Sequence, residues 1–287
     1  MSLNKIYRPI ILALLFVGCT NDFEEINTNP NAPVDVQPSL LLRQVQWDFA
    51  EQMSYEGFVA GNLLGQYFTA IDFNLFDRHS LNEPQFGGNP WDFIYVNLRD
   101  NEILLEKAIN NPAIAVYEGP SRIMKAYMGA VLTDIFGDVP YQEAFTGKTG
   151  NIAPVFDEQA EIYTGAEGIL ENLELGISAI EAYQGAIPLE GDILFNGDLA
   201  SWIKFANSLR LKYLMRIANR VDVASEINSI FQAGNFIQTN AENASFDFQN
   251  VPPNNFRMST ARVGDYNLYI MSETVEEILR DLEDPRM

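Results

Sequence analysis

The sequence is poor in the residues that most catalytic and metal sites require. Its 287 residues include one cysteine, Cys19, and one histidine, His79. A single cysteine cannot form an internal disulfide, and one cysteine with one histidine cannot complete a Cys/His zinc cluster. A Ser-His-Asp or Cys-His site would have to use His79, which we interpret as an ordinary loop residue. We therefore expect no metal, no cofactor and no catalytic residue.

Basic residues are scarce as well. Lys and Arg number 18 against 39 Asp and Glu, which gives a formal net charge of −21. Phosphate backbones would repel such a chain, so nucleic acid is excluded as a partner. The sequence also contains no P-loop, GxGxxG, HExxH, GxSxG or CxxC motif. Carboxylates are abundant, but nothing indicates two of them across one cleft, so a hydrolase has little support.

Long apolar runs are almost absent. The unbroken run Ile10–Val17 (IILALLFV) is much too short to span a bilayer as an ordinary helix. Two basic residues precede it, and Gly18 and Cys19 follow it. This order is typical of a bacterial lipoprotein signal, in which a peptidase cuts before a cysteine whose thiol carries diacylglycerol. We predict a signal peptide over 1–18 and lipidation of Cys19; the alternatives are an incidental cysteine or a buried N-terminal strand.

The segment 19–38 is polar and acidic, with several prolines and asparagines. Such a composition cannot bury a core, so an acidic, flexible tether is expected. A calcium cluster of Asp22, Glu24 and Glu25 is the weaker alternative, because no spaced Asp/Asn/Gly loop accompanies it. Removal of 1–18 would lower the formal charge to −23.

The remainder, 39–287, reads as predominantly helical because apolar residues recur at three- and four-residue steps. Strand signals are few, and the stretch 72–90 reads as a long loop. Helix pairs of similar length are typical of tetratricopeptide-like scaffolds. The fold class predicted is therefore mainly α, a helix-pair scaffold with long loops. The helical segments expected are 39–71, 91–108, 120–136, 157–183, 199–218 and 272–282.

The segment 199–218 has the clearest helical pattern. Asp198 is placed to cap its N-terminus. Its apolar stripe comprises Trp202, Phe205, Ala206, Leu209, Tyr213 and Ile217, and its basic residues are Lys204, Arg210, Lys212, Arg216 and Arg220. The basic residues could form an anion site, but a solvated or ion-paired face is the better interpretation in an acidic protein. Likewise, Asp134 and Asp138 could form a dyad, but a helix end followed by a turn explains them more simply.

Several segments resemble the SusD/RagB family of Bacteroidetes outer-membrane lipoproteins, especially its SusD-like, starch-binding-associated branch. They follow the order of the family along nearly the whole chain. These segments are Cys19 with the following FEEINTNPNAP, Trp91–Tyr95 with Asn97, LTDIFGDVPYQEA (132–144), GDLASWIKFANSLRLKYLMRIAN (197–219) and the terminal LEDPRM.

The resemblance implies a helical lipoprotein of the outer membrane that faces the cell exterior and is not an enzyme. It would bind glycans and hand them to a TonB-dependent outer-membrane barrel of the SusC type. The alternative is a peptide-capturing or mainly structural lid of the same kind of importer. Family members usually run longer, so the chain would correspond to the N-terminal portion, and its ligand site could be incomplete.

Glycan binding needs aromatic faces that stack on sugar rings and polar groups that bind the hydroxyls. The stretch 72–97 has both, within the longest irregular segment of the N-terminal half. The candidate ligand-binding residues are Phe73, Phe76, Asp77, Arg78, Trp91 and Asn97. The alternative is that these aromatic rings pack the loop onto the helices.

Overall fold

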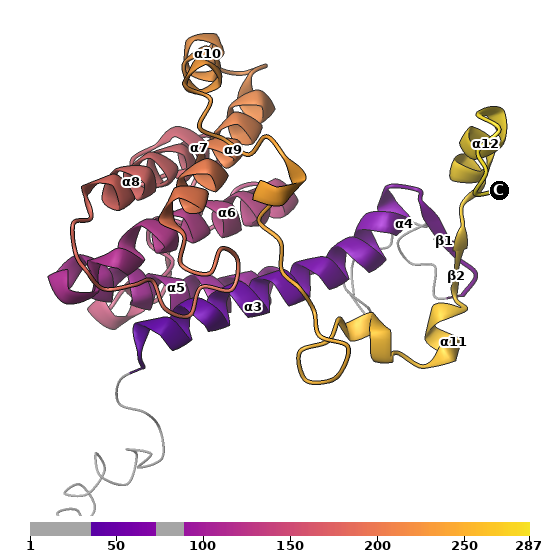
Figure 1. Cartoon of the computed structure of the whole chain (residues 1–287), viewed down its shortest axis with the longest axis horizontal. Coiled ribbons are helices and arrows are strands. Elements are labelled where there is room, and N and C mark those ends of the chain that lie inside the picture. Colours follow the sequence, from indigo (N-terminus) through magenta and orange to yellow (C-terminus); the bar gives the residue numbers. More distant parts are fainter. Residues whose placement is uncertain (1–35, 73–88) are drawn as a thin grey trace, which may run out of the picture. The chain divides into compact units, whose positions relative to one another are not determined.

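The computed structural model describes residues 36–72 and 89–287, and most of these residues are helical (Figure 1). The helices are α3 (Pro38–Glu56), α4 (Asn62–Leu64), α5 (Trp91–Asn110), α6 (Glu118–Phe136), α7 (Gln159–Thr164), α8 (Ile169–Ala182), α9 (Leu199–Ile217), α10 (Ala224–Ala233), α11 (Val263–Tyr266) and α12 (Glu273–Asp281). Short 3-10 turns cover Pro112–Tyr117, Thr146–Thr149, Asn240–Glu242 and Arg257–Thr260. The predicted mainly α, helix-pair fold is confirmed.

Five long helices pack in sequence: α3 against α5, α5 against α6, α6 against α8, and α8 against α9. The contact between α6 and α8 is the most extensive of them. Two glycines face each other there, since a Cβ on Gly176 would lie 3.0 Å from the carbonyl oxygen of Gly119. The absence of both side chains therefore lets the two helix backbones approach closely.

The apolar stripe predicted on α9 faces the core. Trp202 is fully buried, and Phe205, Leu209 and Tyr213 are each less than 9% exposed. Asp198 caps the helix as predicted, because its Oδ1 accepts a hydrogen bond of 3.1 Å from the backbone N–H of Ala200. This helix is thus a buried part of the scaffold.

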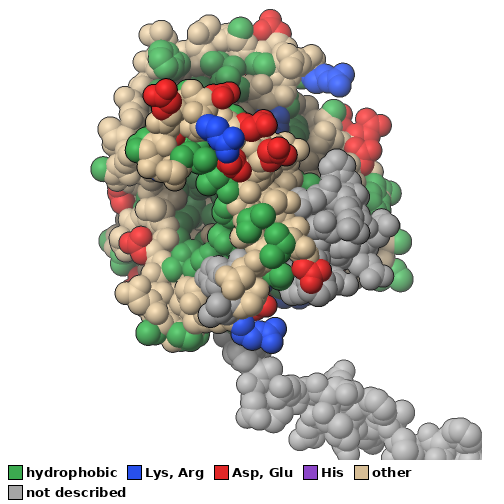
Figure 2. All heavy atoms as spheres, turned by 90° about the vertical axis from the view of Figure 1, so that its right-hand side faces the viewer, with side chains coloured by type: hydrophobic (Ala, Val, Ile, Leu, Met, Phe, Trp, Pro, Cys, Tyr) green, Lys and Arg blue, Asp and Glu red, His purple; other side chains and the backbone are tan. Residues whose placement is uncertain are grey.

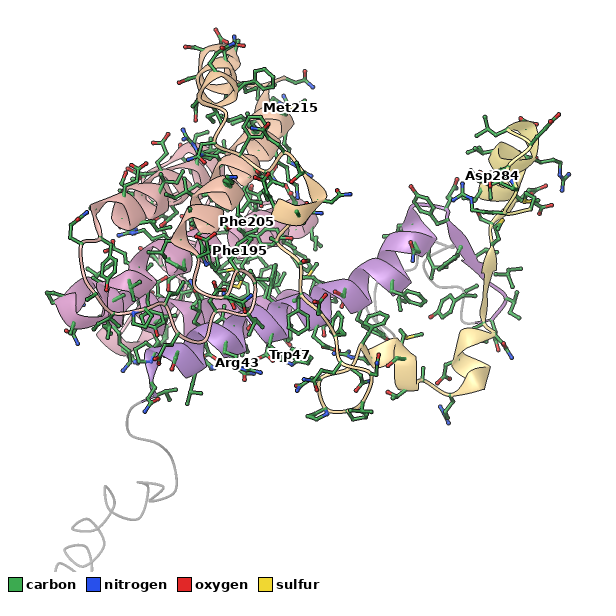
Figure 3. All side chains as sticks on the ribbon, viewed as in Figure 1. Arg43, Trp47, Phe195, Phe205, Met215 and Asp284 are labelled. Atoms are coloured by element: carbon green, nitrogen blue, oxygen red, sulfur yellow. The ribbon has the colours of Figure 1, made fainter. Side chains whose placement is uncertain are left out.

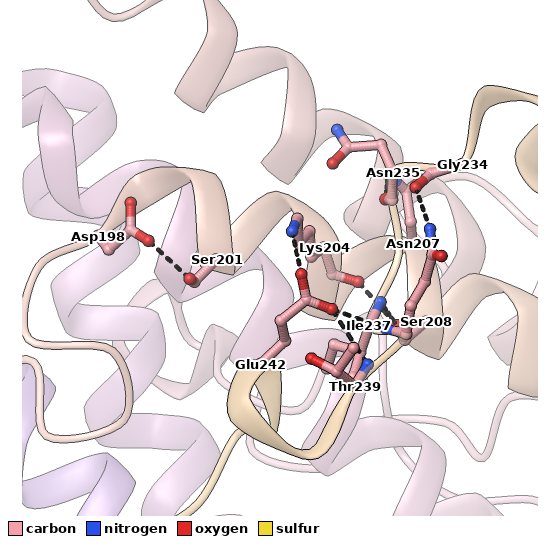
Figure 4. A network of polar contacts seen from close by, with 11 residues as sticks. Asp198, Ser201, Lys204, Asn207, Ser208, Gly234, Asn235, Ile237, Thr239 and Glu242 are labelled. Carbon is pink, nitrogen blue, oxygen red and sulfur yellow. Dashed lines mark hydrogen bonds and ion pairs between the residues drawn. The ribbon is translucent and has the colours of Figure 1, made fainter.

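Three of the four basic residues within α9 form ion pairs, which confirms the interpretation of that face as structural. Arg210 pairs with Glu174 and Glu226, and Arg216 pairs with Asp134. Lys204 binds Glu242, which joins α9 to the segment that follows α10 (Figure 4).

Asp134 and Asp138 serve the structure, as predicted. Asp134 accepts a 2.7 Å hydrogen bond from the hydroxyl of Tyr163. Asp138 accepts a 2.9 Å hydrogen bond from the backbone N–H of Gln159. Each carboxylate therefore links the end of α6 to α7.

Two predicted helical segments are interrupted. In 39–71, α3 gives way to a π-helical turn over Gly57–Gly61 and the single turn of α4. The chain then forms strand β1 (Phe68–Ala70), which pairs antiparallel with β2 (Tyr269–Met271). The prediction of helix over 68–70 is wrong, because this strand pairs with a segment about two hundred residues away, which local periodicity cannot reveal.

The second interruption divides 157–183 into α7 and α8. Gly165 and Gly168 adopt extended backbone conformations between them, and Glu167 has a positive φ of 52°. A Cβ on Gly165 or Gly168 would come within 3.0 Å of a backbone carbonyl oxygen. The continuous helix predicted here is wrong because these glycines allow a tight turn that the apolar spacing does not show.

None of the described helices combines the length and the apolar composition that a membrane-spanning segment requires.

Candidate functional site

An aromatic cluster surrounds Trp91, the first residue of α5. Its ring centroid lies 4.9 Å from that of Tyr95 and 5.0 Å from that of Phe136, at the end of α6. Phe156 stacks on the indole at an interplanar angle of 26° and a centroid distance of 6.4 Å. Phe156 is 64% exposed, so the cluster presents one aromatic ring to solvent, and the other rings pack behind it.

Backbone pairing fixes the segment that carries Phe156. Asp157 and Val139 exchange two backbone hydrogen bonds, of 3.0 and 3.3 Å. The Oδ2 of Asp157 also accepts hydrogen bonds from the backbone N–H groups of Tyr141 and Gln142, at 2.8 and 2.9 Å. The exposed ring therefore precedes a residue that is held by both its backbone and its side chain, which limits the entropy lost when a ligand binds.

Tyr95 fastens the cluster to the turn after α6. Its hydroxyl donates a 2.7 Å hydrogen bond to the carbonyl oxygen of Pro140. Burial, assisted by the Asp157 carboxylate, raises the pKa of Tyr95 well above its ordinary value. The hydroxyl therefore stays protonated and remains a donor at neutral pH.

Two of the predicted ligand-binding residues lie in this region with different surroundings. Trp91 is half-buried within the cluster, beneath the exposed ring of Phe156. Asn97 is only 2% exposed, and its amide donates a 3.2 Å hydrogen bond to the carbonyl oxygen of Phe93. We leave Asn97 out of the proposed site because a ligand cannot reach it from this position. Phe73, Phe76, Asp77 and Arg78 lie outside the described residues, as does Cys19.

Phe156 and Tyr95 were not among the residues predicted from the sequence. Phe156 ends the apolar run 152–156 (IAPVF), which lies between two polar stretches. Such a run outside a helix is the one local signal that could have indicated an exposed aromatic group. Its proximity to Trp91 depends on the pairing of Val139 with Asp157, which no local pattern reveals.

The chain is similar to a known family and to several solved structures. The SusD-like family model described as "Starch-binding associating with outer membrane" matches residues 30–287. A SusD homologue from Bacteroides fragilis is 25% identical with a TM-score of 0.70, covering 88% of this chain and 52% of that one. A SusD/RagB family protein from Bacteroides thetaiotaomicron is 25% identical with a TM-score of 0.72, covering 88% and 53%.

A third similar structure is that of a chitin-binding protein, 25% identical with a TM-score of 0.69, covering 87% of this chain and 54% of that one. No curated protein matches the chain significantly. The extent of the family match shows that the chain belongs to the SusD-like family. It spans about half the length of these solved relatives.

Proposed function

We propose that the chain captures glycans at the outer membrane, without converting them, for import by a TonB-dependent barrel. The description of the family as starch-binding and outer-membrane-associated supports this function, as does the chitin-binding protein among the similar structures. The observation that carries the proposal is the exposed ring of Phe156, supported from below by Trp91. An exposed, fixed aromatic face is the surface on which a sugar ring stacks.

The charge of the chain favours neutral cargo. The formal net charge is −21. On the face seen in Figure 2, acidic side chains lie among hydrophobic ones, and few basic side chains are visible. Anionic ligands would be repelled by such a molecule, whereas uncharged starch-like or chitin-like oligosaccharides would not.

Calorimetry with a panel of malto- and chito-oligosaccharides tests this function. Replacement of Phe156 by Ala should weaken binding by about 1–3 kcal/mol, the range known for stacking of bases on aromatic side chains, with little change in melting temperature. Trp91→Ala should weaken binding as well. Because the indole also packs against neighbouring rings, the melting temperature of this variant must be compared with that of the wild type. Phe231→Ala is the matched control, because Phe231 on α10 is similarly exposed, at 62%, and stacks on Phe236.

Two results would contradict the proposal. Failure of every oligosaccharide to bind the wild-type chain, with retention of peptides instead, would favour a peptide-capturing protein. Equal loss of affinity in Phe156→Ala and Phe231→Ala would show that the Trp91 cluster is not the site.

The membrane attachment belongs to the same proposal: Cys19 carries the lipid after removal of 1–18. One acyl chain anchors only marginally, so the mature N-terminus should carry more than one. In cells fed a labelled fatty acid, the wild-type chain should incorporate label and sediment with membranes, while Cys19→Ala should do neither. A Cys19→Ala chain that is processed to the same mass and stays membrane-bound would contradict lipidation.

The barrel partner can be tested separately from the ligand. A SusC-type barrel from the same organism should co-purify with the tagged wild-type chain in mild detergent, and glycan should remain bound to the complex. Recovery of the chain without any barrel would leave glycan capture in place and exclude the import partnership.

A further inference from the structure

A pocket of about 360 Å³ opens beside Trp47 on α3. Its lining residues come from α3, the loop before α9 and the segment 245–254, which ends in a turn. Arg43 and Trp47, one helical turn apart, both contribute to its wall (Figure 3). The other lining residues are Ile193, Leu194, Asn196, Ser245, Phe246, Asp247, Gln249 and Asn254. The pocket shares no residue with the Trp91 cluster.

The pocket has a fixed aromatic wall. Phe246 meets Trp47 edge to face at a centroid distance of 4.8 Å, and Phe248 does so at 5.8 Å. Phe248 in turn contacts Phe256 at 5.5 Å. Each such pair adds about 0.5–1.5 kcal/mol beyond the burial of its area, so the rings hold the half-buried indole in place at the pocket.

Hydrogen bonds hold the two loops that complete the pocket. The backbone N–H of Ile193 donates to Oε1 of Gln46 at 2.8 Å, and that of Leu194 donates to Oδ1 of Asp192 at 3.0 Å. On the opposite side, the backbone N–H of Gln249 donates to the carbonyl oxygen of Asn254 at 2.7 Å and closes a turn. The pocket is therefore formed before any ligand arrives.

Of the charged and polar side chains that line the pocket, those of Gln249 and Asn254 hydrogen-bond to each other, and four others are free to bind a ligand. Within the residues that the structure describes, the side chains of Arg43, Asp247, Ser245 and Asn196 make no hydrogen bond or ion pair, and Arg43 and Asp247 do not pair with each other although they line the same pocket. This contrasts with the ion-paired arginines elsewhere in the fold, such as Arg122, Arg210 and Arg257.

This combination of groups selects a class of ligand. An indole beside a guanidinium, a carboxylate, a hydroxyl and an amide supplies one apolar face with both donors and acceptors. A purely apolar ligand would displace water from the charged groups without replacing its hydrogen bonds. An anion would be repelled by the carboxylate of Asp247. A sugar ring, with one apolar face and hydroxyls that both donate and accept, satisfies all of them.

We propose that the Trp47 pocket is a second glycan-binding subsite, in which Arg43 and Asp247 bind sugar hydroxyls beside the indole. The ligand class rests on the function proposed above, whereas the location rests on the pocket itself. A chain with two subsites would hold one oligosaccharide at two places or two oligosaccharides at once.

Calorimetry on single and double variants tests the second subsite. Arg43→Gln and Asp247→Asn remove one charge each from exposed positions, so neither should alter the melting temperature. Each should weaken binding by about 10- to 100-fold at one class of site, the effect of losing a hydrogen bond to a charged group. Arg220→Gln is the matched control, since Arg220 is an exposed arginine that makes no ion pair with a described residue and lies outside the pocket. It should bind like the wild type.

Comparison with Phe156→Ala separates this inference from the proposed function. The subsite would be supported if the pocket variants lose glycan affinity while Phe156→Ala retains it. It would also be supported if the pocket variants and Phe156→Ala each lose affinity independently. If Arg43→Gln and Asp247→Asn bind like Arg220→Gln while Phe156→Ala loses binding, the pocket proposal is overturned and glycan capture stands. If the wild-type chain binds no oligosaccharide, both are overturned.

Discussion

The indole Nε1 of Trp202 donates a hydrogen bond of 3.0 Å to the Oδ2 of Asp192, and both side chains are buried. Asp192 lies in the loop before α9 and Trp202 in the first turns of that helix. The same carboxylate accepts hydrogen bonds from the backbone N–H groups of Leu194, Phe195 and Gly197. It therefore defines the path of the loop and joins it to α9.

Gln46 extends this connection to α3. Its amide donates a 3.0 Å hydrogen bond to Oδ1 of Asp192, and it is only 1% exposed. Gly191 must pass close to the same helix, because a Cβ there would lie 2.0 Å from the carbonyl oxygen of Ser39. One buried carboxylate thus holds together α3, the loop and α9, including the loop that forms one wall of the Trp47 pocket.

Replacement of Trp202 by Ala should lower the free energy of unfolding by about 3–5 kcal/mol, the usual effect of deleting a large buried aromatic side chain. Trp202→Phe should lower the free energy of unfolding by less, because the phenyl ring retains most of the apolar contact with Phe195 and Phe205. Its remaining loss comes from the missing hydrogen bond to Asp192. Chemical denaturation of the three proteins measures the difference. A Trp202→Ala chain that melts like the wild type but no longer binds glycan would place Trp202 in a ligand site.

Replacement of Asp192 by Asn should also destabilise the fold strongly. The new NH₂ group would face donors that now bind the carboxylate, and each buried donor left unsatisfied costs about 1–3 kcal/mol. We expect a total loss of about 3 kcal/mol or more in urea denaturation. Asp198→Asn is the matched control, since Asp198 is an exposed helix cap and Asn caps as well as Asp. Similar losses of unfolding free energy in both variants would contradict the role of Asp192 in joining α3, the loop and α9.

The sequence predicts the scaffold better than the site, and α9 shows why. A helix is stabilised by local spacing, so the stripe from Trp202 to Tyr213 and the cap at Asp198 could be read directly. The apolar spacing within 157–183 continues across the turn at Gly165–Gly168, so periodicity alone could not separate α7 from α8.

The Trp91 cluster shows the opposite case. Its aromatic members lie on α5, at the end of α6 and in the segment before α7, and only their packing brings them together. Aromatic residues interleaved with polar ones led to the prediction of Trp91 as a ligand-binding residue, but composition cannot distinguish a ring in contact with ligand from one that supports another ring. The Trp47 pocket was not predicted for a related reason: its walls come from α3, the loop around Ile193 and the segment 245–254, which lie far apart in the sequence.

Introduction of a methyl group at Gly176 should destabilise the contact between α6 and α8. The new Cβ would lie 2.9 Å from Cγ1 of Ile123 and 3.0 Å from the Gly119 carbonyl oxygen. Overpacking of this kind costs about 1–3 kcal/mol, which exceeds the gain in helix propensity of at most about 1 kcal/mol. Gly57→Ala is the control, because nothing lies within 4 Å of its Cβ. If thermal melting shows Gly176→Ala to be as stable as Gly57→Ala, the stability of the fold does not depend on the close approach of α6 and α8.

The contact between Lys204 and Glu242 should make the segment after α10 sensitive to acid. The hydrogen bond from Lys204 lowers the pKa of Glu242 to about 2 from an ordinary value of 4.5, and backbone N–H groups of Gln238 and Thr239 add to the effect (Figure 4). A group with a lowered folded-state pKa stabilises the fold above its unfolded pKa and loses that contribution as the pH falls. The contribution should therefore be complete above about pH 4.5 and disappear between pH 4.5 and about 2.

An NMR titration of the side-chain carboxyl carbons measures this directly. Glu242 should titrate with a midpoint near 2 in the wild-type chain, and Lys204→Met should move the midpoint toward 4.5. Lys212→Met is the matched control, because Lys212 lies over the rings of Tyr127 and Tyr213 and does not pair with Glu242. In denaturation experiments, the stability difference between the wild type and Glu242→Gln should be present at pH 7 and vanish as the pH approaches 2. A wild-type midpoint close to 4.5, or a shift of equal size in Lys212→Met, would show that Lys204 does not hold this carboxylate.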